Sequence, residues 1–549
     1  MCGFLAEFKS EHPTSTLQKQ ADLIQHRGPD QTSLLEYQHG RFVFHRLAIV
    51  DQSEQGQQPF QKKETVVVCN GEIYNEPQLR PEYEAQSYPF QSTSDCEILL
   101  PLYEEHGAKG MMERLDGEFA FVLYDSSTHS VFAGRDPMGI RPLFYGYSAQ
   151  DGLLFASEAK ALHEVCEEIT PFPPGALLSV DLHSPRSLKW ESLCQLWVPS
   201  RFHGDSLEDV KTGIRERLVE GVRKRLRSDV PLGFLLSGGL DSSLVCSIAA
   251  RLIDQPITTF SIGIVDGPID THYARQVAEY LGTIHHEYLF TRQEMMDHLS
   301  ELIFQLETWD ITTIRASMGM SLLCKYIREK TDIKVVLTGE VSDEIFGYKY
   351  TDFAPNAQAF QDEAAKRVEE LYLYDVLRAD RCISLHGLEA RVPFSDTDFV
   401  DYVMGIDPEM KMNKYNMGKY LLRAAFEEDG YLPESILFRQ KAAFSDAVGH
   451  SMVDELKAYA DAYYSEAEFE QKRQQYAHGT PFTKESLLYR EIFESHFPGR
   501  SELIPDFWMP NREWQGCDVQ DPSARVLSNY GASGAVLVSD KKTSKSHSA

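Results

Sequence analysis

A short loop between an apolar run and a helical pattern carries the densest group of residues that could bind phosphate. The loop follows residues 230–236 and reads Ser237-Gly238-Gly239-Leu240-Asp241-Ser242-Ser243. A buried strand, a tight loop and a helix N-terminus would point backbone N–H groups and the positive end of the helix dipole toward an anion. No Lys follows the glycines, so this is not a Walker A loop. Asp241 suits an anion site when a divalent cation lies between it and the phosphates.

A glycine turn that simply opens a helix is the alternative, and it would suffice for Gly238-Gly239 alone. The serines and Asp241 around the glycines favour a phosphate site.

A second cluster follows the apolar run 334–337 and reads Thr338-Gly339-Glu340-Val341-Ser342-Asp343-Glu344. A helix N-cap with acids in the first turn explains Ser342 and Glu344. Its place directly after a strand favours function for Gly339, Glu340 and Asp343.

The N-terminus carries a candidate nucleophile, because the chain begins Met1-Cys2-Gly3. Removal of Met1 would give Cys2 a free α-amino group with a pKa of about 8, which can accept the thiol proton without a His or Asp partner. The attacking species is the thiolate. A Cys at position two is usually incidental, so the segments that follow it decide: His26–Asp30, Arg46–Val50, Asn70–Asn75 and Ser94-Asp95.

These motifs together resemble a known family. The loop 237–243 resembles the pyrophosphate loop of ATP pyrophosphatases, which cleave ATP between the α- and β-phosphates. The N-terminal segments resemble the N-terminal-nucleophile glutaminase domain of class II glutamine amidotransferases. In this order the two resemble glutamine-dependent asparagine synthetases, and the resemblance runs from Cys2 to about Tyr530.

The resemblance implies roles in glutamine hydrolysis. The Asn70 side chain and the Gly71 N–H would form an oxyanion hole for attack by Cys2, although an Asn-Gly turn is the simpler explanation of that pair. Arg46 would bind the glutamine α-carboxylate through its fork, and Asp95 would bind the α-ammonium unless it only caps a helix. Further glutamine contacts are expected from Leu47, Ala48, Ile49, Val50 and Glu72.

The resemblance also implies roles in the chemistry of ATP. Asp241 and Asp343 would hold Mg²⁺ on the phosphates, since hard oxygens suit that ion. Glu340 matches the family residue tied to the reaction intermediate. The expected ATP contacts are Leu235, Ser237, Gly238, Gly239, Asp241, Ser242, Ile262, Thr338, Gly339 and Lys441. Lys441 is equally well explained as a surface lysine. The segment 386–394 resembles one near the acyl substrate, which makes Glu389 and Arg391 candidate contacts.

Three departures from the family pattern affect the second cluster and the lysine segment. Val341 stands where the family has Gly, the stretch 347–350 is about one residue short, and Ala442 replaces a Glu. A β-branched Val341 disfavours a left-handed backbone, so we expect a reshaped loop. These changes bear on efficiency and on the choice of acyl substrate.

The periodicity predicts two domains of different class. Short apolar runs and turns over the first ~190 residues predict two antiparallel sheets with covering helices at about 16–25 and 94–105. From residue 207 onward, strands at 231–236, 258–264, 286–290 and 334–337 alternate with helices, which predicts a doubly wound parallel sheet. The expected helices cover 207–227, 242–253, 273–281, 292–307, 318–329 and 368–378. The fold class is thus α+β followed by α/β.

The resemblance assigns functions to these domains. An αββα N-terminal-nucleophile glutaminase domain is expected at 2–195, and an ATP-pyrophosphatase domain with a parallel sheet at 206–520. Residues 531–549, rich in Ser, Lys and Gly, are expected to be disordered.

Composition excludes several classes of protein. The chain has 549 residues, 42% hydrophobic and 25% charged, which is typical of a globular protein of two or more domains. A net charge of −29 argues against nucleic acid and anionic membranes as partners. Nine cysteines without a CxxC pair, no apolar run near ~20 residues and no signal-peptide pattern indicate a cytoplasmic protein.

We therefore expect an asparagine synthetase activity with glutamine, aspartate and ATP as small-molecule substrates, Mg²⁺ as cofactor, and a homodimer as a compatible assembly. Two alternatives stay open. One is an amidotransferase of the same architecture that acts on another carboxylate. The other is a non-catalytic sensor of glutamine or nucleotide, although the presence of Cys2, Asp241 and Asp343 argues against it.

Overall fold

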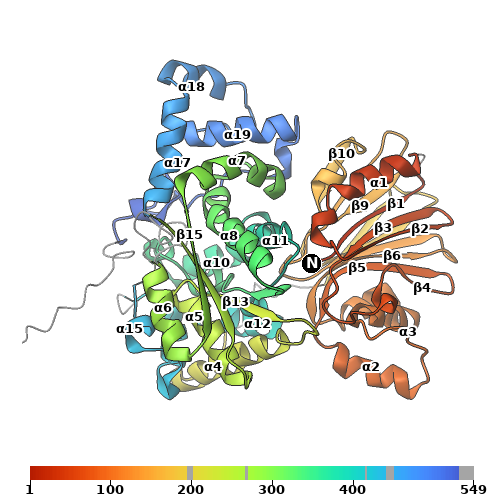
Figure 1. The fold of residues 1–549 in the computed structure, drawn as a ribbon, viewed down its shortest axis with the longest axis horizontal. Helices are drawn as coiled ribbons and strands as arrows, with labels where there is room; N and C mark the ends of the chain where they lie inside the picture. The colour runs from red at the N-terminus through yellow and green to blue at the C-terminus, as the bar shows by residue number, and fades with distance from the viewer. Residues whose placement is uncertain (11, 194–201, 266–269, 414–416, 441–449, 531–549) are drawn as a thin grey trace, which may run out of the picture.

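Two lobes of different architecture lie side by side, and the N-terminus lies at their junction (Figure 1). The structure is a computed structural model that describes residues 1–10, 12–193, 202–265, 270–413, 417–440 and 450–530. The first lobe is built from antiparallel sheets and the second from a parallel sheet with many helices, as the sequence predicts. Lys441 and the expected disordered segment 531–549 lie outside the described residues.

The first lobe is a sandwich of two six-stranded antiparallel sheets. In spatial order, one sheet contains β10 (Glu168–Pro171), β8 (Phe144–Tyr147), β9 (Leu153–Ala156), β1 (Gly3–Phe8), β3 (Gly40–Arg46) and β2 (Gln31–Tyr37). The other contains β12 (Leu188–Ser192), β11 (Ala176–Asp181), β7 (Ser130–Arg135), β6 (Gly117–Asp125), β5 (Thr65–Ile73) and β4 (Phe60–Lys62). Because successive side chains alternate between faces, Phe4 and Val66 enter the core between the sheets, whereas Leu5 and Val67 face outward.

Helices cover the outer faces of this sandwich. On one side Leu17 and Ala21 of α1 (Thr14–Asp22) pack on Leu5. On the other, α2 (Glu76–Ala85) and α3 (Leu99–Met112) cover β5 and β6. The expected helix at 94–105 begins instead with a 3₁₀ turn at Asp95–Ile98. The αββα architecture expected for this lobe is confirmed.

The second lobe contains a five-stranded sheet whose neighbouring strands are all parallel. Its spatial order is β15 (Ile284–Phe290), β14 (Thr258–Ile264), β13 (Leu232–Leu235), β16 (Val335–Leu337) and β17 (Glu389–Arg391). Along the chain, β13, β14 and β15 follow one another toward one edge of the sheet, and β16 and β17 then follow one another toward the other edge. The order therefore reverses between β13 and β16, and ligands bind at such a reversal in doubly wound sheets.

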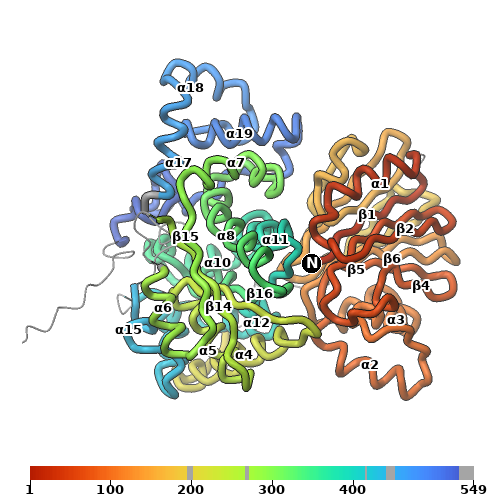
Figure 2. Tube along the Cα trace, in the orientation of Figure 1, coloured from red at the N-terminus to blue at the C-terminus, as the bar shows by residue number. Residues whose placement is uncertain are grey.

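Helices pack on both faces of the parallel sheet. One face is covered by α4 (Leu207–Lys224), α5 (Leu240–Leu252), α6 (Asp270–Leu281), α9 (Ser342–Phe346), α12 (Thr397–Gly405) and α14 (Tyr420–Ala425). The core on the other face is shared by α7 (Arg292–Leu306), α8 (Ile311–Lys330), α11 (Asp375–Ser384), α17 (His450–Tyr463) and α19 (Lys484–His496). The remaining helices are α10 (Ala357–Glu370), α13 (Pro408–Lys411), α15 (Glu434–Leu437) and α18 (Glu466–Arg473). Beyond α7, helices α17 to α19 form a further layer (Figure 2).

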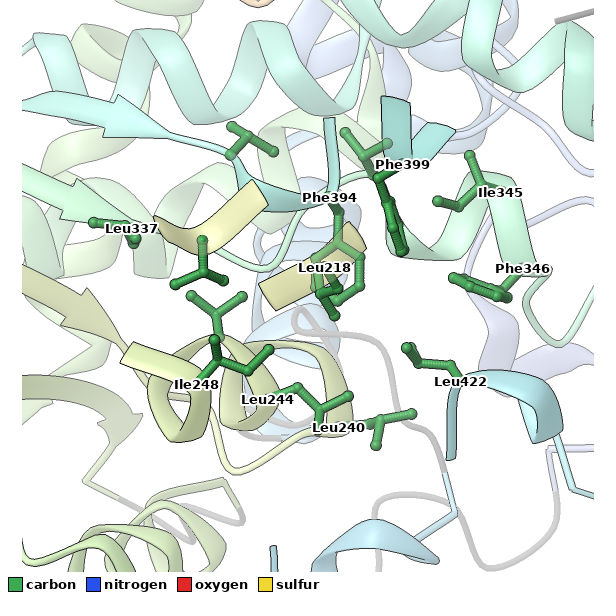
Figure 3. Close-up of a cluster of buried hydrophobic side chains, with 14 of the residues drawn as sticks. Leu218, Leu240, Leu244, Ile248, Leu337, Ile345, Phe346, Phe394, Phe399 and Leu422 are labelled. Carbon is green, nitrogen blue, oxygen red and sulfur yellow. The ribbon is translucent and has the colours of Figure 1, made fainter. Parts of the chain in front are cut away.

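The core between α5 and the sheet fixes the loop that is expected to bind phosphate. Figure 3 shows Leu240, Leu244 and Ile248 of α5 gathered with Leu337 of β16 and Phe394. These residues anchor the first turn of α5 against the sheet. The loop between β13 and α5 is consequently held at both ends.

The expected helix at 368–378 is wrong. The chain forms α10, a 3₁₀ turn at Leu371–Leu373 and then α11. Leu371 packs in the core on one face of the sheet, whereas Leu373 and Tyr374 pack in the core on the other. The backbone leaves the helical region at Tyr374, with φ −131° and ψ −86°, so α10 and α11 are separate helices.

Buried ion pairs join the two lobes. Arg27 donates to Asp380 at 2.7 Å, and Arg225 donates to Glu118 at 2.8 Å. All four side chains are almost completely buried. Breaking such a pair leaves an uncompensated buried charge, so the pairs hold the lobes in one relative position. In the part of the chain that is described, no helix is both long and apolar enough to cross a membrane.

Candidate active sites

The first candidate site lies at the end of the sandwich that faces the second lobe. Alternation along β1 directs the Cys2 side chain to the same interior as Phe4, and alternation along β5 directs Asn70 there with Val68. Asn70 is fully buried, and neither its amide nitrogen nor its amide oxygen has a hydrogen-bond partner among the residues described. Buried polar atoms are normally paired, so this amide is available to a ligand.

Only glycine fits at position 71, because the backbone of the neighbouring strand β6 passes very close to it. A Cβ atom there would lie 2.2 Å from the Glu118 carbonyl oxygen on the paired strand β6. The absence of a side chain lets β5 and β6 pair beside Asn70. A simple Asn-Gly turn does not describe this pair, since both residues lie within β5.

The Cys2 thiol faces the Leu47 carbonyl oxygen at 3.8 Å. Burial raises the pKa of this thiol to about 11 while Met1 is attached. The Met1 amino group is itself buried and donates to the Leu388 carbonyl of the second lobe at 3.1 Å. Burial lowers the pKa of this amino group to about 5. Met1 therefore fills the space between Cys2 and the second lobe.

Arg46 and Asp95 are both held by hydrogen bonds within the first lobe. The Arg46 guanidinium donates to the Ser53 carbonyl at 2.6 Å and to Gln31 at 3.0 Å. Asp95 accepts the Ile73 N–H at 2.6 Å, and burial raises the pKa of its carboxyl to about 6. Asp95 is not an N-cap, because Ser94 holds that position.

The other expected glutamine contacts divide into two groups. Leu47, Ala48 and Ile49 form the buried segment after β3, where the Ala48 N–H donates to Asp30 at 2.8 Å; the less buried Val50 follows them. Glu72 instead directs its carboxylate to Arg391 of the second lobe, at 3.1 Å. The other carboxylate oxygen of Glu72, Oε1, is buried and has no hydrogen-bond partner among the residues described.

The second candidate site is a cavity of about 220 Å³ at the carboxyl ends of β13, β14 and β16. It lies where the strand order reverses, the expected place for a ligand. Most of the expected ATP contacts line it: Leu235, Ser237, Gly239, Asp241, Ser242, Ile262, Thr338 and Gly339. Gly238 turns toward α6 with φ +72°, where a Cβ would lie 2.5 Å from the Ala274 nitrogen.

A buried lysine joins the two predicted metal ligands. The Lys419 ammonium lies 2.8 Å from Asp241 Oδ1 and 2.5 Å from Asp343 Oδ1. The Ser342 hydroxyl also donates to Asp241 at 2.8 Å. Sequence reasoning missed Lys419, because nothing in its neighbourhood distinguishes it from a surface lysine.

The arrangement fits a divalent cation. The carboxylates of Asp241 and Asp343 converge on one point, and carboxylate oxygens are preferred ligands of Mg²⁺. Across the described ranges, no group of three or more His, Cys, Asp or Glu side chains is placed to hold a metal. A cation here would therefore complete its coordination with phosphate oxygens and water.

Glu340 is fixed by an arginine that sequence reasoning also missed. Its two carboxylate oxygens accept from Arg378 of α11 at 2.6 and 3.2 Å. Arg378 also donates to Asp375 at 2.9 Å. Because Glu340 precedes α9 and is paired to α11, a first-turn role at a helix N-terminus does not account for its position.

Glu389 and Arg391 do not meet the expectation that they contact the acyl substrate. Both are buried between the lobes, where Arg391 pairs with Glu72 at 3.1 Å and with Glu389 at 2.9 Å. The part of the wall near Trp508 and Ser523 comes instead from the C-terminal segment. That segment is fixed by Asp521, which pairs with Arg315 at 3.0 Å.

Val341 adopts the left-handed conformation that the sequence argues against, with φ 80° and ψ −23°. The expectation of a backbone that avoids this region is wrong. The side chain is almost fully buried, in the same core as Ile345 and Phe346. Burial of the side chain offsets a backbone cost of about 1–2 kcal/mol.

Val341→Gly should be more stable than Val341→Ala, which reverses the usual order. Both variants lose the buried methyl groups, but only glycine is free of the left-handed strain. We expect the glycine variant to unfold about 2 °C above the alanine variant, from roughly 1 kcal/mol. Thermal unfolding measured side by side tests this. An alanine variant as stable as the glycine variant would show that no strain is present.

Comparisons with known proteins agree with both sites. Residues 1–180 match the family model described as a glutamine amidotransferase domain, and residues 213–361 and 351–520 match the one described as asparagine synthase. The chain is 41% identical to the glutamine-hydrolysing asparagine synthetase of Bos taurus, with 97% of this chain and 99% of that protein covered. It is also 41% identical to a probable enzyme of the same name from Acanthamoeba polyphaga mimivirus, with 92% and 95% covered. The corresponding Homo sapiens enzyme is 40% identical, with 96% and 99% covered.

Proposed function

The chain belongs to the family of glutamine-hydrolysing asparagine synthetases, and from this premise we propose that it converts L-aspartate, L-glutamine and ATP into L-asparagine, L-glutamate, AMP and diphosphate. The observation that carries the proposal is the pairing of two sites in one chain. One site has a thiol beside an unpaired buried amide, and the other has a phosphate loop beside two convergent carboxylates.

We assign glutamine hydrolysis to residues 2–195 and amide synthesis to residues 206–520. After Met1 is removed, the Cys2 amino group would accept the thiol proton. The sulfur would then bond to the glutamine side-chain carbonyl carbon, and the Asn70 amide and Gly71 N–H would stabilise the oxyanion. Ammonia leaves, and water cleaves the thioester to glutamate. Arg46 and Asp95 would hold the α-carboxylate and α-ammonium of glutamine.

In the second lobe, the backbone N–H groups of residues 237–242 would bind the ATP phosphates at the start of α5. Asp241 and Asp343 would hold Mg²⁺, which neutralises phosphate charge when it is bound. Lys419 would supply a second positive charge, and Lys441 a third. An oxygen of the aspartate β-carboxylate bonds to the α-phosphorus, diphosphate leaves, and β-aspartyl-AMP remains.

Ammonia must reach this intermediate without becoming ammonium. The paired side chains between the lobes are buried away from solvent, so we propose that ammonia passes between the lobes rather than through solvent. The nitrogen then bonds to the β-carbonyl carbon, AMP leaves, and the surplus proton passes to Glu340.

Incubation with aspartate, glutamine and MgATP tests the proposal. We expect asparagine, glutamate, AMP and diphosphate in equal amounts. Diphosphate without asparagine, or product with a different carboxylic acid only, would favour an amidotransferase with another acceptor. Glutamine and nucleotide binding without turnover would favour the non-catalytic sensor.

Asp241→Asn and Asp343→Asn should each lower diphosphate release by about 10–100-fold with either glutamine or ammonia. Each change removes one negative charge from the proposed Mg²⁺ site, and with it one of the two ion pairs that Lys419 makes there. Glutamine hydrolysis in the other lobe should continue. Asp297→Asn, at an exposed position on α7, is the matched control. Normal diphosphate release by both site variants would refute the proposed pair of ligands.

Two further proposals concern the protein as a whole. A cytoplasmic location is supported by the eight free cysteines of the described residues, since reduced thiols are typical of that compartment. A homodimer rests on the family resemblance alone, and analytical ultracentrifugation would test it.

A further inference from the structure

The strand that carries the proposed oxyanion hole loses its neighbour on one side just before it reaches the hole. β4 pairs with β5 over residues 60–62, which lie opposite residues 65–67. The same antiparallel register, continued, would place Gln58 opposite Cys69. Pro59 lies between Gln58 and β4, and a proline has no N–H with which to extend the ladder. The backbone pairing therefore ends before β5 reaches the oxyanion hole.

The Gln58 side chain takes over where that backbone pairing ends. Its Oε1 atom accepts the Cys69 N–H at 2.7 Å, and its Nε2 atom donates to the Cys69 carbonyl at 3.0 Å. These are the two hydrogen bonds that a backbone residue opposite Cys69 would make in an antiparallel pair. Gln58 is 5% exposed, and its own carbonyl accepts the hydroxyl of Ser33 on β2 in the other sheet. Its backbone is thus held by β2 and its side chain by β5.

Two neighbouring residues, Asp95 and Cys96, cover the next part of the same edge of β5. The Cys96 thiol donates to the Gly71 carbonyl at 3.7 Å, and the Asp95 carboxylate accepts the Ile73 N–H at 2.6 Å. The N–H and the carbonyl of one strand residue point to the same edge, and alternate residues share that edge. The Gly71 N–H therefore points to the edge of β5 that lies between Gln58 and Asp95.

The proposed oxyanion hole depends on the direction of its two donors. Donors stabilise an oxyanion when they lie within hydrogen-bond distance of the position that the charged oxygen will occupy. The Asn70 amide has no hydrogen-bond partner among the residues described, so its direction depends on the backbone that carries it. The Cys69 carbonyl, to which Gln58 donates, belongs to the peptide group that joins Cys69 to Asn70. Gln58 therefore acts directly on the backbone of the first donor.

We propose that Gln58 is a positioning residue for glutamine hydrolysis, because its carboxamide replaces the missing strand partner and fixes the direction of the Asn70 amide and the Gly71 N–H. This inference rests on the proposed function. Gln58 then acts on the tetrahedral intermediate, in which the oxyanion exists, and little on the binding of glutamine. The α-carboxylate and α-ammonium of glutamine are assigned to Arg46 and Asp95, which Gln58 leaves unchanged.

The test compares a ligand that forms a tetrahedral oxyanion with one that does not. In the aldehyde analogue of glutamine, a –CHO group replaces the carboxamide. The Cys2 sulfur bonds to its carbonyl carbon, the electron pair of the C=O bond moves to the oxygen, and the thiol proton passes to the Cys2 amino group. Glutamate carries the same α-groups but forms no such adduct. Glutamine hydrolysis gives kcat and KM, and competition against glutamine gives both inhibition constants.

Gln58→Leu, which removes both hydrogen bonds to Cys69, should lower kcat for glutamine hydrolysis by about 10–100-fold. The inhibition constant of the aldehyde should rise comparably, whereas KM and the inhibition constant of glutamate should change less than about threefold. Gln58→Glu keeps the oxygen that accepts the Cys69 N–H and should recover part of the rate. Gln20→Leu, which changes another buried glutamine of the same lobe, is the matched control and should leave kcat nearly unchanged.

Ammonia-dependent asparagine formation reports whether the second lobe is folded, and inhibition by glutamate reports the same for the first. Unchanged kcat in Gln58→Leu, or equal changes for the aldehyde and for glutamate, would overturn the positioning role. If Gln58→Leu does not fold, the same two outcomes in Gln58→Glu decide. If the unaltered chain hydrolyses no glutamine, the proposed function falls and the inference with it. If it does so and the Gln58 variants keep its kcat, the positioning role alone is wrong.

Discussion

Cys2→Ala should abolish glutamine hydrolysis and glutamine-dependent asparagine formation, while ammonia-dependent formation persists. The thiol is the only proposed nucleophile for the carboxamide, so its loss removes a covalent step rather than weakening one. The second lobe is built from residue 207 onward, and in the proposed scheme Cys2 supplies it only with ammonia. Parallel assays with glutamine and with ammonium salt, each measuring asparagine and glutamate, give the comparison.

A control separates the nucleophile from a packing effect. Cys166→Ala removes another buried thiol of the same lobe and should leave glutamine hydrolysis nearly unchanged. An N-terminal extension that keeps Met1 attached should reproduce the Cys2→Ala result, because it denies Cys2 its amino group. Residual glutamine hydrolysis in Cys2→Ala would contradict the assignment of the nucleophile.

The sequence predicted the residues that lie close to their own motif. Ser237, Asp241 and Ser242 follow one strand, and Thr338 and Glu340 follow another. Because β13 and β16 are parallel neighbours, their carboxyl ends place both loops at one cavity. The fold class was predictable for the same reason, since apolar runs of strand and helix period are local signals.

The residues that the sequence did not predict reach the site from a distance. Lys419 contacts Asp241 across 178 positions of the chain, and Arg378 contacts Glu340 across 38. Neither stands in a motif with its partner. Only the folded chain shows that the Lys419 ammonium is buried between carboxylates instead of exposed to water.

The expectation for residues 389–391 is wrong for a related reason, because their partners also lie far away in the sequence. Glu389 and Arg391 were expected to contact the substrate because the segment 386–394 resembles one near the acyl substrate. They form the short strand β17, and their charges are satisfied within the interface between the lobes. A charged side chain in a sequence does not indicate whether its partner is a substrate or another domain.

Glu340→Gln should leave glutamine hydrolysis unchanged and lower asparagine formation by about 10²–10⁴-fold, from either nitrogen source. When ammonia attacks β-aspartyl-AMP, the new nitrogen carries a positive charge and must lose a proton before AMP leaves productively. The Glu340 carboxylate lines the cavity and is held in place by Arg378 through both oxygens. An amide of the same size cannot accept that proton. Steady-state asparagine formation at saturating ammonia gives the effect on kcat, which corresponds to about 3–5 kcal/mol of barrier.

Arg378 makes this prediction sharper. If Glu340 only holds Arg378 in place, Glu340→Gln removes just that ion pair, and Arg378 is still held by Asp375 at 2.9 Å. The loss of a base, in contrast, also removes the dependence of kcat on ionisation of that group. Glu340→Asp, which keeps the carboxylate on a shorter side chain, should restore part of the rate, whereas Glu340→Ala should not. Glu329→Gln, at the exposed end of α8, controls for charge. If Glu340→Gln lost only severalfold in rate, the pair with Arg378 would be a structural contact, and the proton would have to leave by way of water.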